Sequence, residues 1–279
     1  MTAGPAPLGG RLARGARLVI GVIHLLPLPG APRWGGDFAA VLDRARADLL
    51  ALAAGGVDAA IVENFGDAPF RPGAVEPETV AALARVLTEL RPLTALPLGV
   101  NVLRNDAAAA LALAAVCAGP GAFIRVNVHV GAMVTDQGVI EGRADRTLRR
   151  RRELGAEAVA ILADVLVKHA APLGGLPIED AARDATERGL ADALIVTGAG
   201  TGRATDLGDV RRVRAALPDV PLLVGSGVTA ETVRETLALA DGVIAGTALK
   251  ACGVTTAPVD VERVRRFVAA AKKGLRTQD

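Results

Sequence analysis

The chain contains few aromatic residues, cysteines and histidines. Its 279 residues include no Tyr, one Trp and five Phe, so Ala, Val and Leu must build the core. The two cysteines, Cys117 and Cys252, match no metal-binding spacing, and we expect buried thiols in a reducing compartment rather than a disulfide. The three His residues are scattered, which gives no support to a zinc site. A net charge of +2 is too balanced to indicate a nucleic-acid partner.

Two segments resemble membrane or export signals, and neither is convincing. The apolar run that follows Arg17 resembles a secretory leader, but it contains His24 and three prolines. Residues 107–124 carry no formal charge, yet Gly119-Pro120-Gly121 interrupts them, so we expect a buried helix, a loop and a strand. We therefore predict a cytoplasmic protein without stable membrane insertion. The basic run Arg149–Arg152 is expected to be a solvated helix face.

The chain does contain a repeated alternation of short apolar runs and amphipathic stretches. The runs lack strict polar alternation, as parallel strands that are covered on both faces do. They are Leu18–His24, Ala59–Glu63, Pro97–Asn101, Phe123–Val128, Ala158–Asp164, Ala193–Val196, Pro221–Val224 and Gly242–Ala245. The segments between them place apolar residues at helical spacing, as Val41, Ala45, Leu49 and Leu52 do.

This alternation predicts a single (β/α)8 TIM barrel over residues 17–279, because about 250 residues is the usual length of that fold. A doubly wound open sheet is the competing interpretation. Residues 1–16 are rich in Gly, Pro and Arg and are expected to form a flexible N-terminal tail. Barrels of this kind often associate through their outer helices, so the sequence leaves a homo-oligomer open.

Two turns that combine Gly with a hydroxyl residue follow the last two predicted strands. They are Gly225-Ser226-Gly227 and Gly246-Thr247. In many barrels the loops after strands seven and eight bind a phosphate, because Gly lets backbone N–H groups approach the oxygens. Ser226 and Thr247 could add hydroxyl donors. We therefore predict a phosphorylated small-molecule ligand, against the alternative of ordinary tight turns.

The sixth predicted strand runs into a Gly-rich segment that begins with Thr197 and Gly198. Position 203 is Arg203, so the segment lacks the third Gly of a dinucleotide-binding motif. We expect a mobile lip over the mouth, with Thr197 and Gly198 among the ligand-binding residues.

Polar residues stand at the remaining predicted strand ends. They are His24, Glu63, Asn101, Arg125, Asn127, Asp164 and Lys168. Arg125 and Asn127 share one strand face, and if that face is the barrel interior, Arg125 must pair with Glu63 or Asp164. Together with Asn101, they are candidate substrate-binding residues.

The same residues offer proton-transfer chemistry. Asp164 or Glu63 could act as a base, with Lys168 or His24 as the acid or electrostatic stabiliser. The carboxylates could also hold Mg²⁺ beside a phosphate, although no ligand spacing demands a metal. The structural alternatives are a His bonded to a neighbouring loop and an Asp–Lys ion pair on the rim.

The longest motifs resemble the BtpA/SgcQ family. They are Ile20–Gly30, Val62–Phe70, Gly99–Asp106, Phe123–Asn127, Thr135–Gly138, Ala163–His169 and Gly225–Thr229, in order within residues 18–270. The loop after His169 and the segment 197–203 depart from the pattern. The resemblance implies a TIM barrel of the ribulose-phosphate-binding type. The family takes its name from photosystem I biogenesis in cyanobacteria, and some relatives are associated with carbohydrate uptake and metabolism.

Three function classes follow, and we favour the first. It is an enzyme that acts on a phosphorylated sugar or nucleoside-like molecule by isomerisation, aldol-type cleavage or glycosyl transfer. The second is a non-enzymatic assembly or stability factor, which predicts a mouth filled by ion pairs and an exposed apolar patch elsewhere. Nucleotide hydrolysis ranks last, because the chain has no G-x-x-x-x-G-K-[ST] loop.

Overall fold

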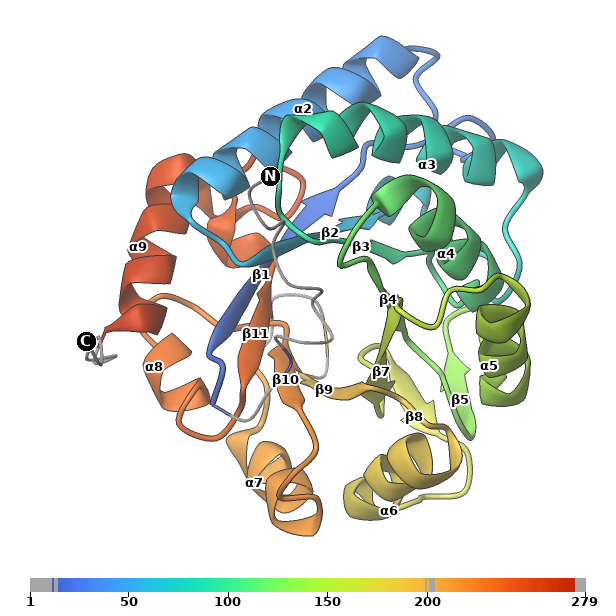
Figure 1. Ribbon diagram of the computed structural model, residues 1–279, viewed down its shortest axis with the longest axis vertical. Coiled ribbons are helices and arrows are strands. Elements are labelled where there is room, and N and C mark those ends of the chain that lie inside the picture. The colour runs from blue at the N-terminus through green and yellow to red at the C-terminus, as the bar shows by residue number, and fades with distance from the viewer. Residues whose placement is uncertain (1–11, 13–14, 199, 201–203, 274–279) are drawn as a thin grey trace.

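Eight parallel strands close into a barrel in the order β1-β11-β10-β9-β7-β4-β3-β2, with helices around the outside (Figure 1). The computed structural model describes residues 12, 15–198, 200 and 204–273. The predicted TIM barrel is confirmed, and the open sheet is the wrong alternative. Most of the tail predicted for residues 1–16 lies outside the described residues.

The barrel strands agree closely with the predicted runs. They are β1 (Leu18–His24), β2 (Ala59–Glu63), β3 (Leu98–Asn101), β4 (Phe123–Val126), β7 (Ala160–Val165), β9 (Ala193–Thr197), β10 (Leu222–Gly225) and β11 (Gly242–Ala245). The first, second and last of these keep the predicted bounds, and the other ends move by one or two residues.

Eight outer helices lie within the described residues. They are α2 (Phe38–Gly55), α3 (Pro77–Leu90), α4 (Ala107–Leu113), α5 (Ala144–Glu153), α6 (Ile178–Arg183), α7 (Leu207–Ala216), α8 (Val233–Thr236) and α9 (Val261–Lys272). Four of these eight helices, α2, α4, α7 and α9, begin at an Asp whose side chain caps the helix. For α2, the Asp37 side chain accepts the Ala40 N–H, and Gly56 ends the helix with a left-handed φ of 86°. The Arg149–Arg152 run lies on α5, where these side chains pair with surface carboxylates, as expected.

Short helical turns complete the outer layer. Two π-helical turns, Ala114–Ala118 and Asp184–Arg188, extend α4 and α6. Single 3₁₀ turns cover Phe65–Asp67, Arg91–Leu93, Thr247–Leu249 and Ala251–Gly253.

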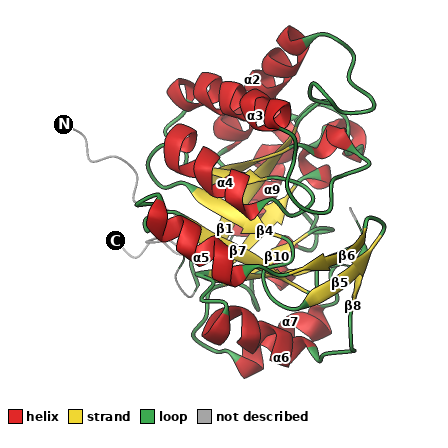
Figure 2. Ribbon diagram, turned by 90° about the vertical axis from the view of Figure 1, so that its right-hand side faces the viewer, coloured by secondary structure: helices red, strands yellow, loops and turns green. Residues whose placement is uncertain are grey.

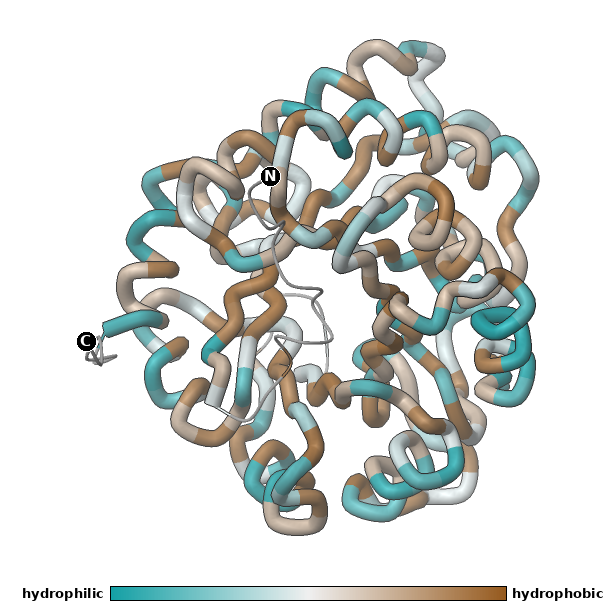
Figure 3. Tube along the Cα trace, viewed as in Figure 1, coloured by the Kyte–Doolittle hydropathy of each residue, from teal (hydrophilic) through white to brown (hydrophobic). Residues whose placement is uncertain are grey.

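Strand alternation divides the barrel interior into layers. Every second residue points inward, and a buried apolar cluster fills the lower layers. This cluster includes Ile20, Val22, Ile61, Phe123, Leu162, Ile195 and Ile244. The strands are correspondingly apolar in Figure 3, with hydrophilic residues on the outer helices. The next inward positions along the same strands form the uppermost layer, so the packing that fills the barrel also selects which side chains reach its mouth.

A small antiparallel sheet, which the sequence did not predict, stands outside the ring of barrel strands (Figure 2). It contains β5 (Ala132–Thr135), β6 (Gly138–Glu141) and β8 (Ala170–Pro172) in the order β6-β5-β8. Its strands are inserted after β4 and after β7, so the sheet lies beside the part of the mouth that these strands form. Val134 and Val139 are directly paired across β5 and β6 and are 45% and 52% exposed.

None of the helices within the described residues has the length and apolar character needed to cross a membrane. Residues 107–124 form α4, its π-helical turn, a loop and the start of β4, as the interrupted apolar pattern indicates. Both cysteines are free thiols, but Cys252 is exposed and Cys117 is only half-buried. The expectation of two buried thiols is therefore wrong.

The barrel interior leaves no room for a side chain at Gly99 on β3. A Cβ there would lie 2.2 Å from Cε2 of the fully buried Phe123 ring. We expect Gly99→Ala to destabilise the protein by about 1–3 kcal/mol, measured by urea unfolding, because a packed core resists added volume. Gly73→Ala is the control, since a Cβ at Gly73 meets no atom within 4 Å. Equal unfolding midpoints for the two variants would contradict this account.

Candidate active site

The mouth of the barrel is lined by the inward side chains that follow the apolar layers. His24 comes two residues after Val22 on β1, and Glu63 two residues after Ile61 on β2. Arg125 and Asp164 stand in the same relation to Phe123 and Leu162 on β4 and β7. The structure therefore brings together side chains that are up to 140 positions apart.

Arg125 lies at the centre of this layer, fully buried between two carboxylates. Its Nε and Nη2 donate to Oδ1 and Oδ2 of Asp164, both at 3.0 Å, and its Nη1 donates to Oε1 of Glu63 at 3.3 Å. The predicted pairing of Arg125 with Glu63 or Asp164 is confirmed, and both carboxylates take part. A bidentate contact of this kind fixes both the position and the plane of the guanidinium.

Two amides hold the carboxylates in place. Asn101 Nδ2 donates to Glu63 Oε1 at 3.0 Å, and Asn127 Nδ2 donates to Asp164 Oδ2 at 2.7 Å. Asp164 thus has partners on both oxygens, and its side chain is 0% exposed. Glu63 Oε2 instead remains directed toward His24 Nε2, at 3.8 Å. Of the two carboxylates, Glu63 is the one that borders the open mouth.

The charges around Glu63 keep it ionised. Burial acts to raise the pKa of Glu63, but the positive charges of Arg125 and Lys168, together with the hydrogen bond from the Asn101 amide, outweigh it. The pKa of Glu63 consequently lies below its ordinary value. A carboxylate that is ionised and only partly hydrogen-bonded has a lone pair available to accept a proton.

Lys168 is presented by an unusual segment of backbone after β7. Leu166 and His169 have left-handed φ angles of 51° and 56°, a conformation that non-Gly residues adopt rarely and often near functional sites. Thr197 Oγ1 accepts the Lys168 N–H at 3.1 Å, and the Lys168 carbonyl accepts Arg104 Nη2 at 2.5 Å. Thr197 therefore supports the Lys168 segment, and Gly198 lies buried directly after it.

The Lys168 ammonium is more acidic than that of an exposed lysine. Burial and the neighbouring Arg125 lower the pKa of Lys168, while Glu63 and Asp164 act in the opposite direction. This residue borders both cavities described below. A lysine with a lowered pKa is suited to giving a proton to a substrate or to holding an anion.

His24 is held as a neutral imidazole. Its ring packs on Phe65 with a centroid separation of 4.4 Å, and Nδ1 lies 3.4 Å from the Thr255 carbonyl. A carbonyl accepts only, so this contact assigns the ring proton to Nδ1 and leaves the Nε2 lone pair facing the mouth. Gly246 faces the ring, because a Cβ at that position would lie 2.9 Å from His24 Cε1.

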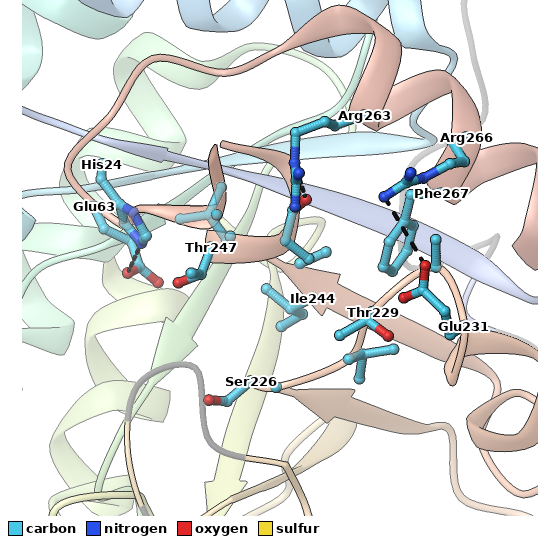
Figure 4. Close-up of a pocket in the computed structure, with 18 of the residues that line it drawn as sticks. His24, Glu63, Ser226, Thr229, Glu231, Ile244, Thr247, Arg263, Arg266 and Phe267 are labelled. Atoms are coloured by element: carbon cyan, nitrogen blue, oxygen red, sulfur yellow. Dashed lines mark hydrogen bonds and ion pairs between the residues drawn. The ribbon is translucent and has the colours of Figure 1, made fainter. Parts of the chain in front are cut away.

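The loops after β10 and β11 border a cavity of about 230 Å³ that also reaches Glu63, Arg125 and Lys168. We call it the phosphate lobe (Figure 4). Within the described part of the chain, the backbone N–H groups of Gly227, Val228, Thr247 and Ala248 donate to no protein acceptor. Ser226 and Gly227 both have left-handed φ angles, of 85° and 68°. Two turns with free N–H groups that border one cavity suit an anion.

The hydroxyl groups of these turns are already engaged. Ser226 Oγ donates to the Gly200 carbonyl at 2.9 Å, and Thr247 Oγ1 lies 2.9 Å from Thr255 Oγ1. The backbone, rather than these hydroxyl groups, therefore provides the free donors. Residues 199 and 201–203 of the predicted lip lie outside the described residues, and Gly200 contacts the turn after β10.

Four arginines that were not among the predicted site residues border the mouth, namely Arg33, Arg104, Arg263 and Arg266. Arg263 and Arg266 of α9 line the phosphate lobe, where Arg263 Nε donates to the Ala248 carbonyl at 3.0 Å. Arg266 lies 3.9 Å from Glu231 (Figure 4). Arg104 follows β3 and borders the second cavity. The α9 pattern marks only its apolar face, and a charged residue next to that face gives no signal that separates a ligand contact from solvent exposure.

A second cavity of about 590 Å³ opens on the other side of Arg125. We call it the Arg104 lobe. It shares Glu63, Arg125 and Lys168 with the phosphate lobe, so the two lobes meet at the same three ionisable groups. Asn101 and Asn127 line the Arg104 lobe, whereas Asp164 lines neither of the two.

The two carboxylates are not arranged as a metal site. Arg125 occupies the position between Glu63 and Asp164 that the sequence left open for Mg²⁺. Across the described residues, no group of three or more His, Cys, Asp or Glu side chains is placed to hold a metal ion.

Comparisons with known proteins agree with this architecture. Residues 16–273 match the sequence profile of the BtpA family. Photosystem I biogenesis protein BtpA of Synechocystis sp. is 48% identical over 260 residues, which cover 93% of this chain and 90% of that protein. The putative sgc region protein SgcQ of Escherichia coli is 36% identical over 256 residues, which cover 90% of this chain and 93% of that protein.

Solved structures with low sequence identity share the fold. A structure described as native KDPGal has a TM-score of 0.55 at 15% identity and covers 91% of this chain and 94% of its own. Phosphoribosyl anthranilate isomerase from Thermococcus kodakaraensis has a TM-score of 0.52 at 17% identity and covers 92% of this chain and 99% of its own. At such identities the likeness shows the fold alone.

The environment of His24 predicts a pH dependence. Burial, opposed mainly by Glu63, lowers the pKa of His24 from 6.5 to about 4. The unfolded chain therefore takes up this proton before the folded protein does as the pH falls. Stability should be unaffected by His24 above pH 6.5 and should fall by about 3 kcal/mol between pH 6.5 and pH 4.

Urea unfolding across this pH range measures the effect. The wild type should lose about 3 kcal/mol relative to His24→Gln, which has no imidazole to titrate. Proton NMR of the three histidines gives the pKa directly, since the variant identifies the His24 signal by its loss. A His24 signal that titrates near pH 6.5 would disprove the assignment.

Proposed function

The chain belongs to the BtpA family, and from this membership and the geometry of the mouth we propose that it is an enzyme acting on a phosphorylated sugar or nucleoside-like small molecule. One observation carries the proposal. The cavity bordered by free backbone N–H groups also contains Glu63, Arg125 and Lys168. An anion site and proton-transfer groups thus share one opening, as catalysis on a phosphorylated substrate requires.

In the proposed complex the phosphate lies against the two turns. Gly227 and Val228 donate from one side, and Thr247 and Ala248 donate from the other. Arg263 and Arg266 add positive charge from α9. Fixing the phosphate in this way would leave the reacting carbons over the centre of the barrel, because the same cavity continues to Glu63 and Lys168.

In this proposal some of the ionisable groups transfer protons, and another holds its neighbour in position. Glu63 is the proposed base, because it is ionised and Oε2 has no hydrogen-bond donor within the described part of the chain. Lys168, whose pKa is lowered, is the proposed acid or electrostatic stabiliser. Asp164 has both oxygens occupied and would act by positioning Arg125, rather than by taking a proton itself.

Neutral His24 supplies the remaining polar atom, its Nε2 lone pair beside Glu63. It would accept a hydrogen bond from a substrate hydroxyl. Isomerisation, aldol-type cleavage and glycosyl transfer all need a proton moved beside a fixed phosphate, and this set of groups suits each of them.

A non-enzymatic assembly factor is the second candidate, and one observation favours it. Val134 and Val139 form an exposed apolar pair on the small sheet, and Leu173 beside it is 61% exposed. A relative is named for photosystem I biogenesis. However, the mouth holds two cavities rather than being filled by ion pairs, which favours the enzyme.

Inorganic phosphate tests the anion site. Phosphate in 100-fold excess over its Kd should stabilise the folded protein by about 2.7 kcal/mol, because it binds only the folded state. Ser226→Asp should abolish the resulting rise in Tm, since it adds a carboxylate beside the N–H groups. Ser226→Asn is the matched control, because Asn has the same size without the charge and also tolerates the left-handed φ of this position. Equal responses of both variants would argue against phosphate binding here.

Deuterium exchange tests the chemistry without knowledge of the product. The protein is incubated in D₂O with a panel of sugar phosphates, and NMR follows the loss of carbon-bound protons. Lys168→Met should slow exchange by about 10²–10⁴-fold, the usual contribution of a general acid or base. Its unfolding midpoint should stay near that of the wild type. Glu153→Gln on α5, where the side chain is 63% exposed, should exchange normally. Wild-type exchange rates in Lys168→Met would remove Lys168 from the mechanism.

A further inference from the structure

The Arg104 lobe carries positive charge that the protein does not neutralise. Arg33, Arg104 and Lys168 border it together with Arg125. Glu63 and Asp164 are already paired with Arg125. The remaining acid at the lobe, Asp136, is 65% exposed and lies 3.7 Å from Arg104 Nη1. In the described residues, Arg33 and Lys168 form no ion pair at all.

Unsatisfied polar atoms gather at the same lobe. Three buried side-chain atoms in the described part of the chain have no hydrogen-bond partner, namely Arg104 Nε, Asn127 Oδ1 and His129 Nδ1. Arg104 and Asn127 both line the Arg104 lobe. Buried polar atoms are nearly always paired in folded proteins, so two orphans beside one cavity indicate a site that a ligand completes. Asn127 must direct its amide nitrogen to Asp164, which leaves the oxygen as the acceptor without a donor.

Apolar side chains line part of the same lobe. Phe65, Phe70, Leu103 and Val167 contribute to its walls. Charged groups in such surroundings interact more strongly than at an open surface, because little water screens them. Arg104 itself is only 6% exposed. An anionic group that enters the lobe would therefore meet a partly desolvated guanidinium.

We propose that the Arg104 lobe binds a carboxylate of the substrate, so that the substrate class is a phosphorylated sugar acid. The proposal rests on the proposed function, which places the phosphate in the neighbouring lobe. The carboxylate would lie toward Arg104, with Arg33 and Lys168 nearby. Hydroxyl groups on the adjoining carbons would supply the donor that Asn127 Oδ1 lacks. Glu63 and Lys168, which border both lobes, would then face the carbons between the two anionic ends.

The surroundings of the lobe favour a carboxylate over a second phosphate. Guanidinium groups border both lobes, and a planar guanidinium pairs with two oxygens of a carboxylate or of a phosphate, so the donors alone do not choose between them. A second phosphate would bring up to two negative charges into a lobe whose walls are largely apolar.

Two acyclic ligands of the same length provide the test. Gluconate 6-phosphate and sorbitol 6-phosphate differ only in the carboxylate, and calorimetry gives the Kd of each for the full chain. We expect gluconate 6-phosphate to bind about tenfold more tightly, as one charge-assisted contact allows. Equal Kd values would overturn the carboxylate site, as would tighter binding of fructose 1,6-bisphosphate than of gluconate 6-phosphate.

Variants locate the effect. Arg104→Met should reduce the tenfold preference to about twofold or less while leaving the rise in Tm with inorganic phosphate unchanged. Arg33→Met should weaken the preference in the same direction, and Arg33 is an exposed residue whose loss does not threaten folding. Arg150→Met on α5 is the control, since it removes the same charge far from the mouth. A full preference retained in both Arg104→Met and Arg33→Met would overturn the assignment to this lobe.

The two proposals fail in different ways. If inorganic phosphate gives no stabilisation but gluconate 6-phosphate still binds more tightly than sorbitol 6-phosphate, the phosphate site is wrong and the carboxylate site stands. If inorganic phosphate stabilises the protein and the two 6-phosphates bind equally, the carboxylate site alone is wrong.

Discussion

Arg125 lies fully inside the barrel, where an unpaired cation would cost many kcal/mol, and its neutralisation constrains everything around it. Asp164 supplies that neutralisation from the adjacent strand β7, and Glu63 supplies it from β2, which lies beyond β3. Because both carboxylates are also held by amides, Arg125, the two carboxylates and the two amides form one connected network of five side chains. Such a network is most rigid when every member is satisfied, and within it Glu63 Oε2 and Asn127 Oδ1 accept no hydrogen bond from the described residues. The position of the proposed base thus follows from the need to bury the arginine.

The same neutralisation explains why the rest of the mouth is positive. Glu63 and Asp164 both pair with Arg125, which leaves Arg104 with only the exposed Asp136, at 3.7 Å, and Lys168 with no ion pair among the described residues. Burial lowers the pKa of both groups, so the protein holds these cations at some cost in stability. If the mouth had only a structural role, an added acidic residue, or the replacement of these cations by apolar residues, would increase the stability of the protein. Positive charge that the protein leaves unpaired beside a cavity is therefore consistent with a binding site for an anionic ligand.

The sequence was informative wherever one local rule decides the structure. Parallel strands buried on both faces read as apolar runs, and their ends came within two residues of the structure. Alternation put Arg125 and Asn127 on one face, which led to the correct partners of Arg125. The β5-β6-β8 sheet was missed because its strands have only three or four residues each, and because β8 pairs with β5 across a gap of more than thirty positions. Arg104 was missed because it lies in the loop after β3, whose course no periodicity encodes. Arg263 was missed because it lies on α9 beside the apolar face, where the helical pattern does not separate a ligand contact from solvent exposure.

Along the strand axis, apolar residues that stabilise the barrel fill the lower layers, and polar residues lie at the mouth. This division limits where a ligand can bind. Apolar residues such as Ile20, Ile61 and Leu162 fill the lower layers, so nothing can enter from below. In the proposed complex a ligand would lie across the top, over Glu63, Arg125 and Lys168, because those three groups border both lobes. Its phosphate would occupy the smaller lobe, and the larger lobe would hold the remainder of the molecule. A molecule with an anionic group at each end would satisfy both lobes at once and would hold its central carbons over the ionised Glu63. The charge distribution of the proposed ligand would thus determine which carbons lie over the proposed base.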